Sequence, residues 1–407
     1  MVVSTLVSAI RRRRPDAEIF GISMTPGDTE SRHGIRAYPI NPGMPMSRQR
    51  GEAARDEPAP SGRRRALARI PGARRLYHAA TATRVAAREV PFALRSYRFL
   101  RTLDAVVVAG SGQLLDEWDP WLHPYTTFRW ALLSRLARAR FVYASVGTGP
   151  IRSPLSAFFF RHAVRWGSYV SIRDDYSVGI LESIGLRGPF VRYPDMAYAY
   201  PGLVETSRAA RRTTGEERPV VGLQVIAYKH PTLWPRGDVR LYEPYFRKMV
   251  GFARRLLEAG CTVRVFSSQV ASDNVVAQEL LEALGEPLAP GRLEFIGPEL
   301  NDVDDLVSAI ARCDVVVAAR FHAALVPLAL GVPVLGLAYN PKTTELFADY
   351  GLGERCLDID EFAPEELEAA FEAVRADGVP AGVEDRVAAN RAAVEAQFDE
   401  LFGRPVV

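Results

Sequence analysis

Short apolar runs that alternate with amphipathic stretches constrain the fold of this chain more than any other feature. Continuous apolar strands separated by helices are typical of parallel sheets covered on both faces. The sequence therefore predicts an α/β protein with parallel sheets. The predicted strands are residues 104–109, 141–145, 169–172, 220–225, 262–267, 293–296, 315–319 and 332–337.

The alternation lapses once, where the sequence becomes polar and loses its periodicity before residue 219. A chain of 407 residues has room for two ordinary domains. We therefore expect two Rossmann-like lobes, over 1–200 and 219–378, joined by a linker over 201–218. Residues 379–407 are expected to form a C-terminal helix that packs back on the first lobe.

The N-terminal part before the first regular strand is less regular. Residues 3–10 show helical spacing and precede Pro15, and residues 18–23 read as a strand followed by a turn at 26–28. Residues 42–75 are rich in Pro, Gly, Arg and small side chains, which predicts a lid that is weakly ordered without ligand.

Charge and cysteine content exclude several classes of protein. The 51 basic residues are nearly balanced by 48 acidic ones, which argues against a nucleic-acid partner. Cys261, Cys313 and Cys356 are too far apart to indicate a disulfide framework or a metal site, so we predict no metal and no bound cofactor. No apolar run approaches the length of a membrane span, and the start is no signal peptide. We expect a cytoplasmic protein.

The two halves repeat one motif at the end of a strand. The run at 104–109 continues into Gly110-Ser111-Gly112, and the run at 314–319 continues into Arg320-Phe321-His322. Ligands of open α/β sheets bind at the carboxyl ends of the strands, and helix N-termini there suit anions. Two such sheets suggest a GT-B-like architecture with the active site in the interdomain cleft.

Arg320 and His322 are the strongest chemical signal. A guanidinium fork and a titratable imidazole, two residues apart, suit a small dianion such as a phosphate or carboxylate, with the histidine available for proton transfer. The alternative is a histidine that caps its helix and an arginine in an interdomain ion pair. The local pattern leaves both open.

Other strand ends carry weaker signals. Gly110-Ser111-Gly112 and the turn at Gly147 would let the backbone approach a ligand, although many turns look alike. Arg173, followed by two aspartates, favours an ion pair with a helix cap over direct catalysis, and Asp195 equally suits a turn. Lys342 is one of three lysines in an arginine-rich chain, which favours an anion contact.

Three of these segments carry a family resemblance: VVVAGSGQLLDEW, YVSIRDDYSVGILESIGL and RFHAALVPLALGVPVLGLAYNPKTTELFADYGL. From about residue 4 to 355 the chain resembles the polysaccharide pyruvyl transferase family. Arg320 and His322 match the family's phosphoenolpyruvate-binding and catalytic pair, with Phe321 in place of its usual leucine. The family usually opens with a strand and an Asn-x-Gly-Asp loop before its first helix, so we expect a further strand to be encoded upstream of Met1.

The resemblance implies transfer of a pyruvyl group from phosphoenolpyruvate to a sugar or glycan acceptor, which could be lipid-linked, with formation of a ketal and release of phosphate. Arg320 and His322 would be catalytic. The candidate substrate-binding residues are Phe321, Gly110, Ser111, Gly112, Gly147, Arg173, Lys229, Arg236 and Lys342.

Two other functions remain open, because a fold does not decide function. One is a nucleotide-sugar glycosyltransferase with a GT-B fold, for which Glu345 would be the carboxylate that holds a ribose. The other is a non-catalytic sugar-binding relative.

Overall fold

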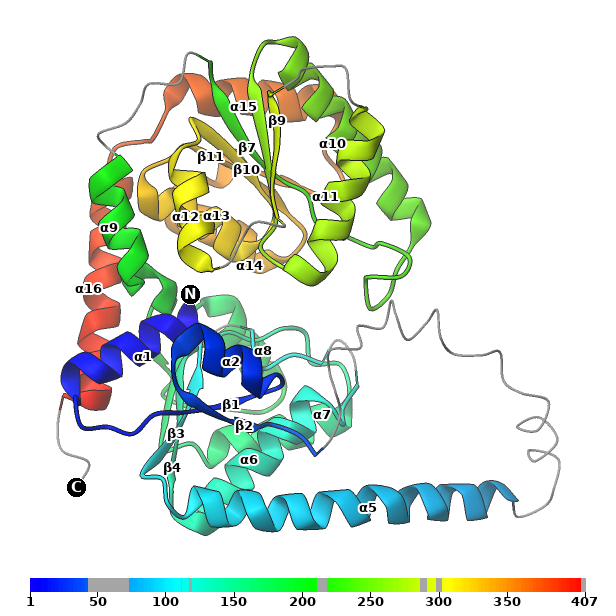
Figure 1. Cartoon of the computed structure of the whole chain (residues 1–407), viewed down its shortest axis with the longest axis vertical. Helices are drawn as coiled ribbons and strands as arrows, with labels where there is room; N and C mark the ends of the chain where they lie inside the picture. The colour runs from blue at the N-terminus through cyan, green and yellow to red at the C-terminus, as the bar shows by residue number, and fades with distance from the viewer. Residues whose placement is uncertain are drawn as a thin grey trace. The chain divides into compact units, whose positions relative to one another are not determined.

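The computed structural model describes residues 1–42, 73–110, 112–116, 119–210, 218–285, 291–297 and 302–403. The chain forms two compact units (Figure 1). The C-terminal unit comprises Met1–Pro15, Ile172–Gly179 and Arg192–Pro405. The N-terminal unit comprises Asp16–Ser171 and Ile180–Val191. The predicted domain limits at 200, 218 and 378 stay a prediction, and the proposed lid at 42–75 lies almost entirely outside the described residues.

A parallel sheet forms the centre of the C-terminal unit, as the apolar runs predict. Its strand order is β12-β11-β10-β7-β8-β9, and every neighbouring pair is parallel. All residues of β7, β8, β10 and β11 are buried, because helices cover both faces. The strands are β7 (Val220–Gln224), β8 (Thr262–Phe266), β9 (Leu293–Ile296), β10 (Val315–Ala318), β11 (Val334–Ala338) and β12 (Cys356–Asp358).

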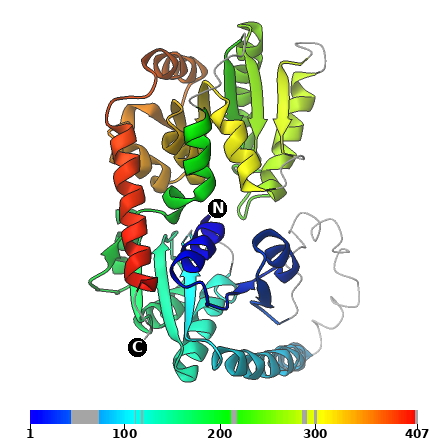
Figure 2. The ribbon, with the colours of Figure 1, turned by 60° about the vertical axis from the view of Figure 1, so that its left-hand side comes forward.

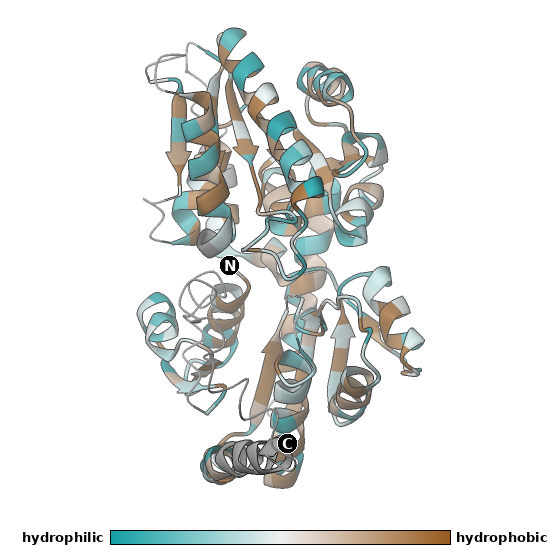
Figure 3. Cartoon of the chain, turned by 90° about the vertical axis from the view of Figure 1, so that its right-hand side faces the viewer, coloured by the Kyte–Doolittle hydropathy of each residue, from teal (hydrophilic) through white to brown (hydrophobic). Residues whose placement is uncertain are grey.

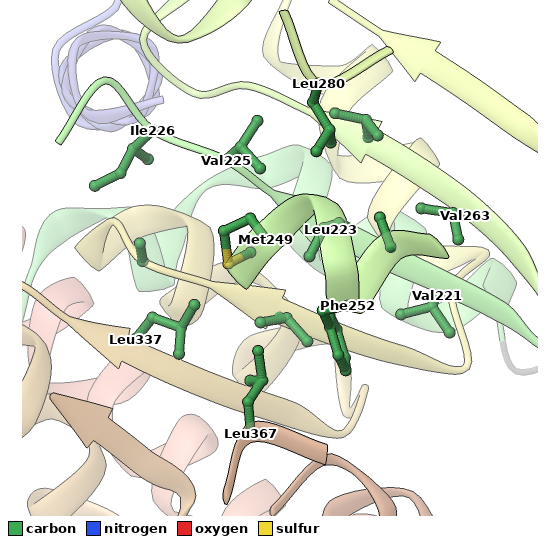
Figure 4. Packing of buried hydrophobic residues seen from close by; sticks show 14 of the residues in the cluster. Val221, Leu223, Val225, Ile226, Met249, Phe252, Val263, Leu280, Leu337 and Leu367 are labelled. Atoms are coloured by element: carbon green, nitrogen blue, oxygen red, sulfur yellow. The ribbon is translucent and has the colours of Figure 1, made fainter. Parts of the chain in front are cut away.

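Helices on the two faces of this sheet belong to different parts of the strand order. The crossovers from β7 to β9 and from β10 to β12 run in opposite directions, so right-handed connections place their helices on opposite faces. On one face, Met249 and Phe252 of α10 pack with Leu223 and Leu367 (Figure 4). The helices are α10 (Val239–Glu258), α11 (Val270–Leu284), α12 (Val303–Ala311), α13 (Phe321–Leu330), α14 (Pro341–Asp349), α15 (Pro364–Asp377) and η3 (Gly353–Arg355).

Four further helices complete the C-terminal unit: α1 (Val2–Arg13), η1 (Met196–Ala199), α9 (Pro201–Ala210) and α16 (Val383–Phe402). Helix α16 packs against α1 and η1, and Arg13 of α1 pairs with Glu395 and Asp399 of α16. Residues Pro201–Ala210, at the start of the expected linker, form α9, which packs on α12 and α13 (Figure 2). Its apolar residues, Leu203 among them, are too few for helical periodicity to be read, yet Leu203 is fully buried.

The N-terminal unit contains a sheet in the order β3-β4-β5-β6 and a separate parallel pair, β1-β2. The predicted burial of the strand at 104–109 is only partly met, because β3 lies at the edge of its sheet and each of its residues is half-buried. The strands are β1 (Phe20–Ser23), β2 (Arg36–Pro39), β3 (Ala105–Ala109), β4 (Arg140–Val146), β5 (Tyr169–Ile172) and β6 (Val191–Arg192).

The helices of this part are α2 (Pro26–His33), α5 (Ala73–Leu100), α6 (His123–Ala137) and α7 (Pro154–Arg165). Helix α8 (Asp175–Ser183) begins in the C-terminal unit, and its residues from Ile180 onward belong to the N-terminal unit. The turn predicted at 26–28 is wrong, because these residues begin α2. Pro26 occupies the first helical position, where its missing N–H costs nothing, and Gly34 ends the helix with φ of 60°. Figure 3 shows apolar strands in the sheets and mixed polarity on the helices.

The N-cap of helix α12 is expected to stabilise the C-terminal unit by a measurable amount. This N-cap is Asp302, whose Oδ1 accepts the N–H groups of Asp304 at 2.8 Å and Asp305 at 3.1 Å. We expect Asp302→Ala to lower the free energy of unfolding by about 1 kcal/mol, measured by urea denaturation, because two amides lose their partner. Asp302→Asn keeps an acceptor and should cost only a fraction of that. An equal loss in both variants would show that the charge matters and the cap does not.

Candidate active site

Arg320 lies where the connections of the six-stranded sheet change direction. Strands β7 and β10 are neighbours, and the helices that follow them cover opposite faces, which is the point where open α/β sheets bind ligands. Gln224, at the end of β7, holds the loop after β10. Its Oε1 accepts the N–H of Ala319 at 3.0 Å and that of Arg320 at 2.9 Å.

The guanidinium of Arg320 forms a fork with a buried carboxylate. Its Nε and Nη2 donate to the two oxygens of Asp273 in α11, both at 2.6 Å, and the Asp273 side chain is 0% exposed. Burial alone would lower the pKa of Arg320, but the hydrogen bonds and charge of Asp273 outweigh it and raise the pKa. The sequence left open an interdomain ion pair for this arginine; the pair that forms lies within the C-terminal unit.

One edge of that guanidinium remains for a ligand. Arginine carries five N–H groups, and Asp273 takes one from Nε and one from Nη2. In the part of the chain that the structure describes, Nη1 has no hydrogen-bond partner, and the Arg320 side chain is 15% exposed. Arg320 is also the N-cap of α13, and no described side chain caps that helix. A fixed cation thus lies beside a helix N-terminus, which suits an anion.

His322 is held by a buried carboxylate from another part of the sequence. Its Nε2 lies 3.4 Å from Oδ1 of Asp195, whose side chain is 1% exposed. Asp195 also receives Nη1 of Arg173 at 2.6 Å and the N–H of Ala197 at 2.9 Å. The imidazole itself is 35% exposed, so it can reach a substrate while Asp195 fixes one nitrogen. Arg173, Asp195 and His322 thus form an ion-pair chain that ends at His322, an accessible acid or base.

Arg173 forms the other end of this ion-pair chain and is buried. Its side chain is 4% exposed, Nε pairs with Asp174 at 2.9 Å, and the guanidinium lies 4.1 Å from the ring centre of Phe321. Asp174 in turn accepts the N–H of Ser177 in α8. The ion pair with a helix cap expected at this position is therefore present, and the substrate contact predicted for Arg173 stays a prediction. The Phe321 ring lies over this guanidinium and also packs against the imidazole of His322.

The pKa of the Asp195 carboxyl makes the contribution of this site to the stability of the fold depend on pH. Burial alone would raise its pKa, but the charge and hydrogen bond of His322, together with Arg173 and the N–H of Ala197, hold the pKa well below its usual range. A carboxyl with a lowered folded-state pKa stabilises the fold above its ordinary pKa of about 3.9, and this stabilisation disappears as the pH falls through the folded-state value.

We therefore expect the difference in unfolding free energy between the native chain and Asp195→Asn to be largest near neutral pH and to shrink below about pH 4. Urea denaturation across that range measures it. Asp377→Asn, at a carboxylate that is 66% exposed, is the matched control and should show little difference at any pH. A difference for Asp195→Asn that does not change with pH would contradict the ion-pair chain.

The predicted cations lie on loops and helix starts of the same unit. Lys229 follows β7 with φ of 55°, and its Nζ lies 5.8 Å from the ring centre of Tyr228. Arg236 is exposed on the loop closed by the bond from the Asp238 N–H to the Lys229 carbonyl. Lys342 lies in the first turn of α14, which Asn340 caps. None of these placements tests a substrate contact, so their binding role stays a prediction.

The glycine-rich candidates lie in the N-terminal unit. Gly110 adopts φ of 38° directly after β3, where a side chain would be strained, and its N–H donates to the Ala144 carbonyl at 2.9 Å. Gly147 accepts the N–H of Leu114. Gly112 lies between these contacts, and Ser111 lies outside the described residues. Both turns therefore contribute to the fold, whether or not they bind a ligand.

Glu345, the carboxylate considered for a ribose, is already engaged. Its Oε2 accepts the N–H of Tyr176 at 3.2 Å, and burial is the largest of the effects that raise its pKa.

Sequence reasoning missed the roles of three residues that hold the site: Asp195, Asp273 and Gln224. Asp195 attracted notice only because it follows a strand, and a turn explained it equally well. Asp273 lies in the first turn of α11, 47 positions before Arg320, with no local sign of its role. The pairing can be recognised only when a buried carboxylate is seen opposite the buried arginine, and that arrangement is known only from the fold.

The described residues contain no group of three or more potential metal ligands. Within the described residues, no helix is long and apolar enough to cross a membrane.

The sequence profile of a family described as polysaccharide pyruvyl transferase matches residues 2–341. Among solved structures, UDP-GlcNAc 2-epimerase from Methanocaldococcus jannaschii has a TM-score of 0.60 at 11% identity, over 98% of this chain and 95% of that one. The enzyme from Neisseria meningitidis, bound to UDP-GlcNAc, has a TM-score of 0.54 at 11% identity, over 98% and 94%. At this identity the likeness concerns the fold, and it confirms the two-unit, GT-B-like α/β class.

Proposed function

Because the chain belongs to the polysaccharide pyruvyl transferase family and is a transferase, we propose that it moves a pyruvyl group from phosphoenolpyruvate to a sugar of a polysaccharide or glycan precursor. Two hydroxyls of the sugar become the oxygens of a ketal, and inorganic phosphate leaves. The observation that supports this best is the accessible His322, fixed by Asp195, two residues from the fixed cation Arg320.

The proposed chemistry begins with proton transfer to the methylene carbon of phosphoenolpyruvate, which makes the adjoining carbon electrophilic. One sugar hydroxyl forms a bond to that carbon, the bond to the phosphate oxygen breaks, and the second hydroxyl closes the ring. One hydroxyl proton ends in the new methyl group and the other on the departing phosphate. A group that gives and takes a proton near neutral pH is required.

His322 suits this task through its second nitrogen. Asp195 faces Nε2, which leaves Nδ1 as the atom that exchanges protons with the substrate. Arg320 suits the carboxylate or phosphate of the donor, because its free Nη1 edge offers parallel N–H groups while Asp273 prevents the side chain from swinging away. Lys229, Arg236 and Lys342 are proposed as further phosphate contacts.

Ligand screening by thermal unfolding tests the proposal. A ligand present at a hundred times its dissociation constant should stabilise the folded chain by about 2.7 kcal/mol. We expect phosphoenolpyruvate to raise Tm, and UDP and GDP to leave it unchanged. Stabilisation by a nucleotide alone would indicate a nucleotide-sugar glycosyltransferase instead. Stabilisation by neither donor, with stabilisation by sugars, would indicate a non-catalytic relative.

A further inference from the structure

Helices α6 and α7 of the N-terminal unit carry a charge pattern that the active site does not use. Residues 120–171 contain seven arginines and two histidines but no aspartate or glutamate. Of these seven, only Arg129 forms a salt bridge with another described residue, Glu89. The chain as a whole is nearly neutral, so the positive charge of this region is local.

The same helices expose large apolar side chains. Trp121 is 60% exposed, Phe158 is 42% exposed and Leu155 is 36% exposed. Trp121 and Phe158 belong to one aromatic layer, because both pack on Phe159, at ring-centre distances of 5.6 and 5.8 Å. Phe128 of α6 joins that layer at 5.1 Å from Phe159.

Both helices cover one face of the sheet. They connect β3 to β4 and β4 to β5, which are successive neighbours, so right-handed crossovers place them on the same side, and they pack against each other (Figure 1). Exposed arginines continue the two helical stripes: Arg135 lies two turns after Phe128, and Arg165 two turns after Phe158. We call this surface the α6–α7 face; its members are Trp121, Leu155, Phe158, Arg135, Arg152 and Arg165.

Two described acidic side chains lie at the edge of this region. Asp116 accepts the N–H of Ser153 at 2.7 Å, and Asp119 accepts the N–H of Trp121 at 2.8 Å. Within the described residues, neither carboxylate forms a salt bridge with one of these arginines. Arg165 donates to the Gly185 carbonyl, which leaves its charge in place.

We propose that the α6–α7 face docks on an anionic phospholipid surface. Tryptophan and phenylalanine settle at the boundary between head groups and acyl chains, and arginines around them attract the negative surface. A second copy of this chain fits the face less well, because a two-fold contact would bring like-charged arginines together. Nucleic acid offers no apolar layer for Leu155 and Phe158. This inference does not depend on the reaction that the chain catalyses.

Vesicle sedimentation tests the docking. The full chain should bind vesicles of phosphatidylcholine mixed with phosphatidylglycerol, bind pure phosphatidylcholine much less, and release as salt is raised. Each arginine near such a surface contributes roughly a fivefold factor, so the triple variant Arg135→Gln, Arg152→Gln, Arg165→Gln should bind on the order of a hundredfold more weakly. Trp121→Ser with Phe158→Ser should also lose binding, at any salt concentration.

Matched controls come from α10 of the other unit. Arg240→Gln, Arg247→Gln and Arg254→Gln make the same charge change, and Val239→Ser with Leu241→Ser removes two exposed apolar side chains. These variants should bind vesicles as the native chain does. Thermal unfolding shows whether each variant is folded. Absence of binding to the mixed vesicles, or equal loss in the α10 variants, would overturn the proposal. A change in sedimenting mass without vesicles, confined to the α6–α7 variants, would overturn it in favour of self-association.

Discussion

Replacement of His322 by alanine is expected to lower kcat by about 10²–10⁴-fold, the contribution of general acid–base catalysis, and to leave the affinity for phosphoenolpyruvate nearly unchanged. The side chain is partly exposed, and its only described polar partner is Asp195. Its loss therefore removes a proton donor without opening the core. Phosphate release with a sugar acceptor measures kcat, and calorimetry with phosphoenolpyruvate measures binding.

Asp195→Asn separates chemistry from orientation. It keeps the size of the side chain but removes the charge that faces Nε2 of His322. We expect a smaller loss of kcat than for His322→Ala, because the imidazole stays in place and loses only the carboxylate that orients it. Near-normal rates in His322→Ala would mean that the histidine is only part of the helix start, and the mechanism proposed above would be wrong.

Arg320→Ala is expected to lower the free energy of unfolding by about 3–5 kcal/mol, because it leaves the buried carboxylate of Asp273 without its partner. It should also weaken phosphoenolpyruvate binding roughly ten- to a hundredfold, the effect of one lost charge-assisted contact. Urea denaturation and calorimetry measure the two effects. Arg320→Lys should restore binding only in part, because an ammonium cannot reproduce the planar fork.

The two effects can be separated in an Asp273→Asn background. There, Arg320→Ala leaves a neutral amide instead of a buried charge, so most of the stability should return while binding stays weak. Arg264→Ala is the matched control, since Arg264 is also buried and pairs with Glu294 at 2.7 Å on another part of the sheet. It should lose stability and keep phosphoenolpyruvate affinity. If Arg320→Ala with Asp273→Asn binds phosphoenolpyruvate normally, the arginine is a structural element and holds no substrate.

Local patterns account for most of the elements around the site. The apolar run that ends at residue 319 is long enough for one strand, and the apolar residues that follow Arg320-Phe321-His322 make a buried helix, so the strand, the junction and the helix were all predictable. Residues 26–28 and 201–210 were not, because few of their side chains are apolar and helix formation there depends on a first-turn proline or on packing against neighbouring helices.

The sequence by itself determined that Arg320 and His322 follow a buried strand and face a helix start, because strand and helix periodicity are local properties of the chain. Only the tertiary structure decided what holds them. Asp273 lies 47 positions from Arg320, and Asp195 lies 127 positions from His322. Asp273 belongs to α11, and the apolar periodicity of a helix does not show which charge its polar side chains pair with. Such pairs form because a buried charge must find an opposite charge wherever the packed elements provide one, and that is a property of the assembled fold.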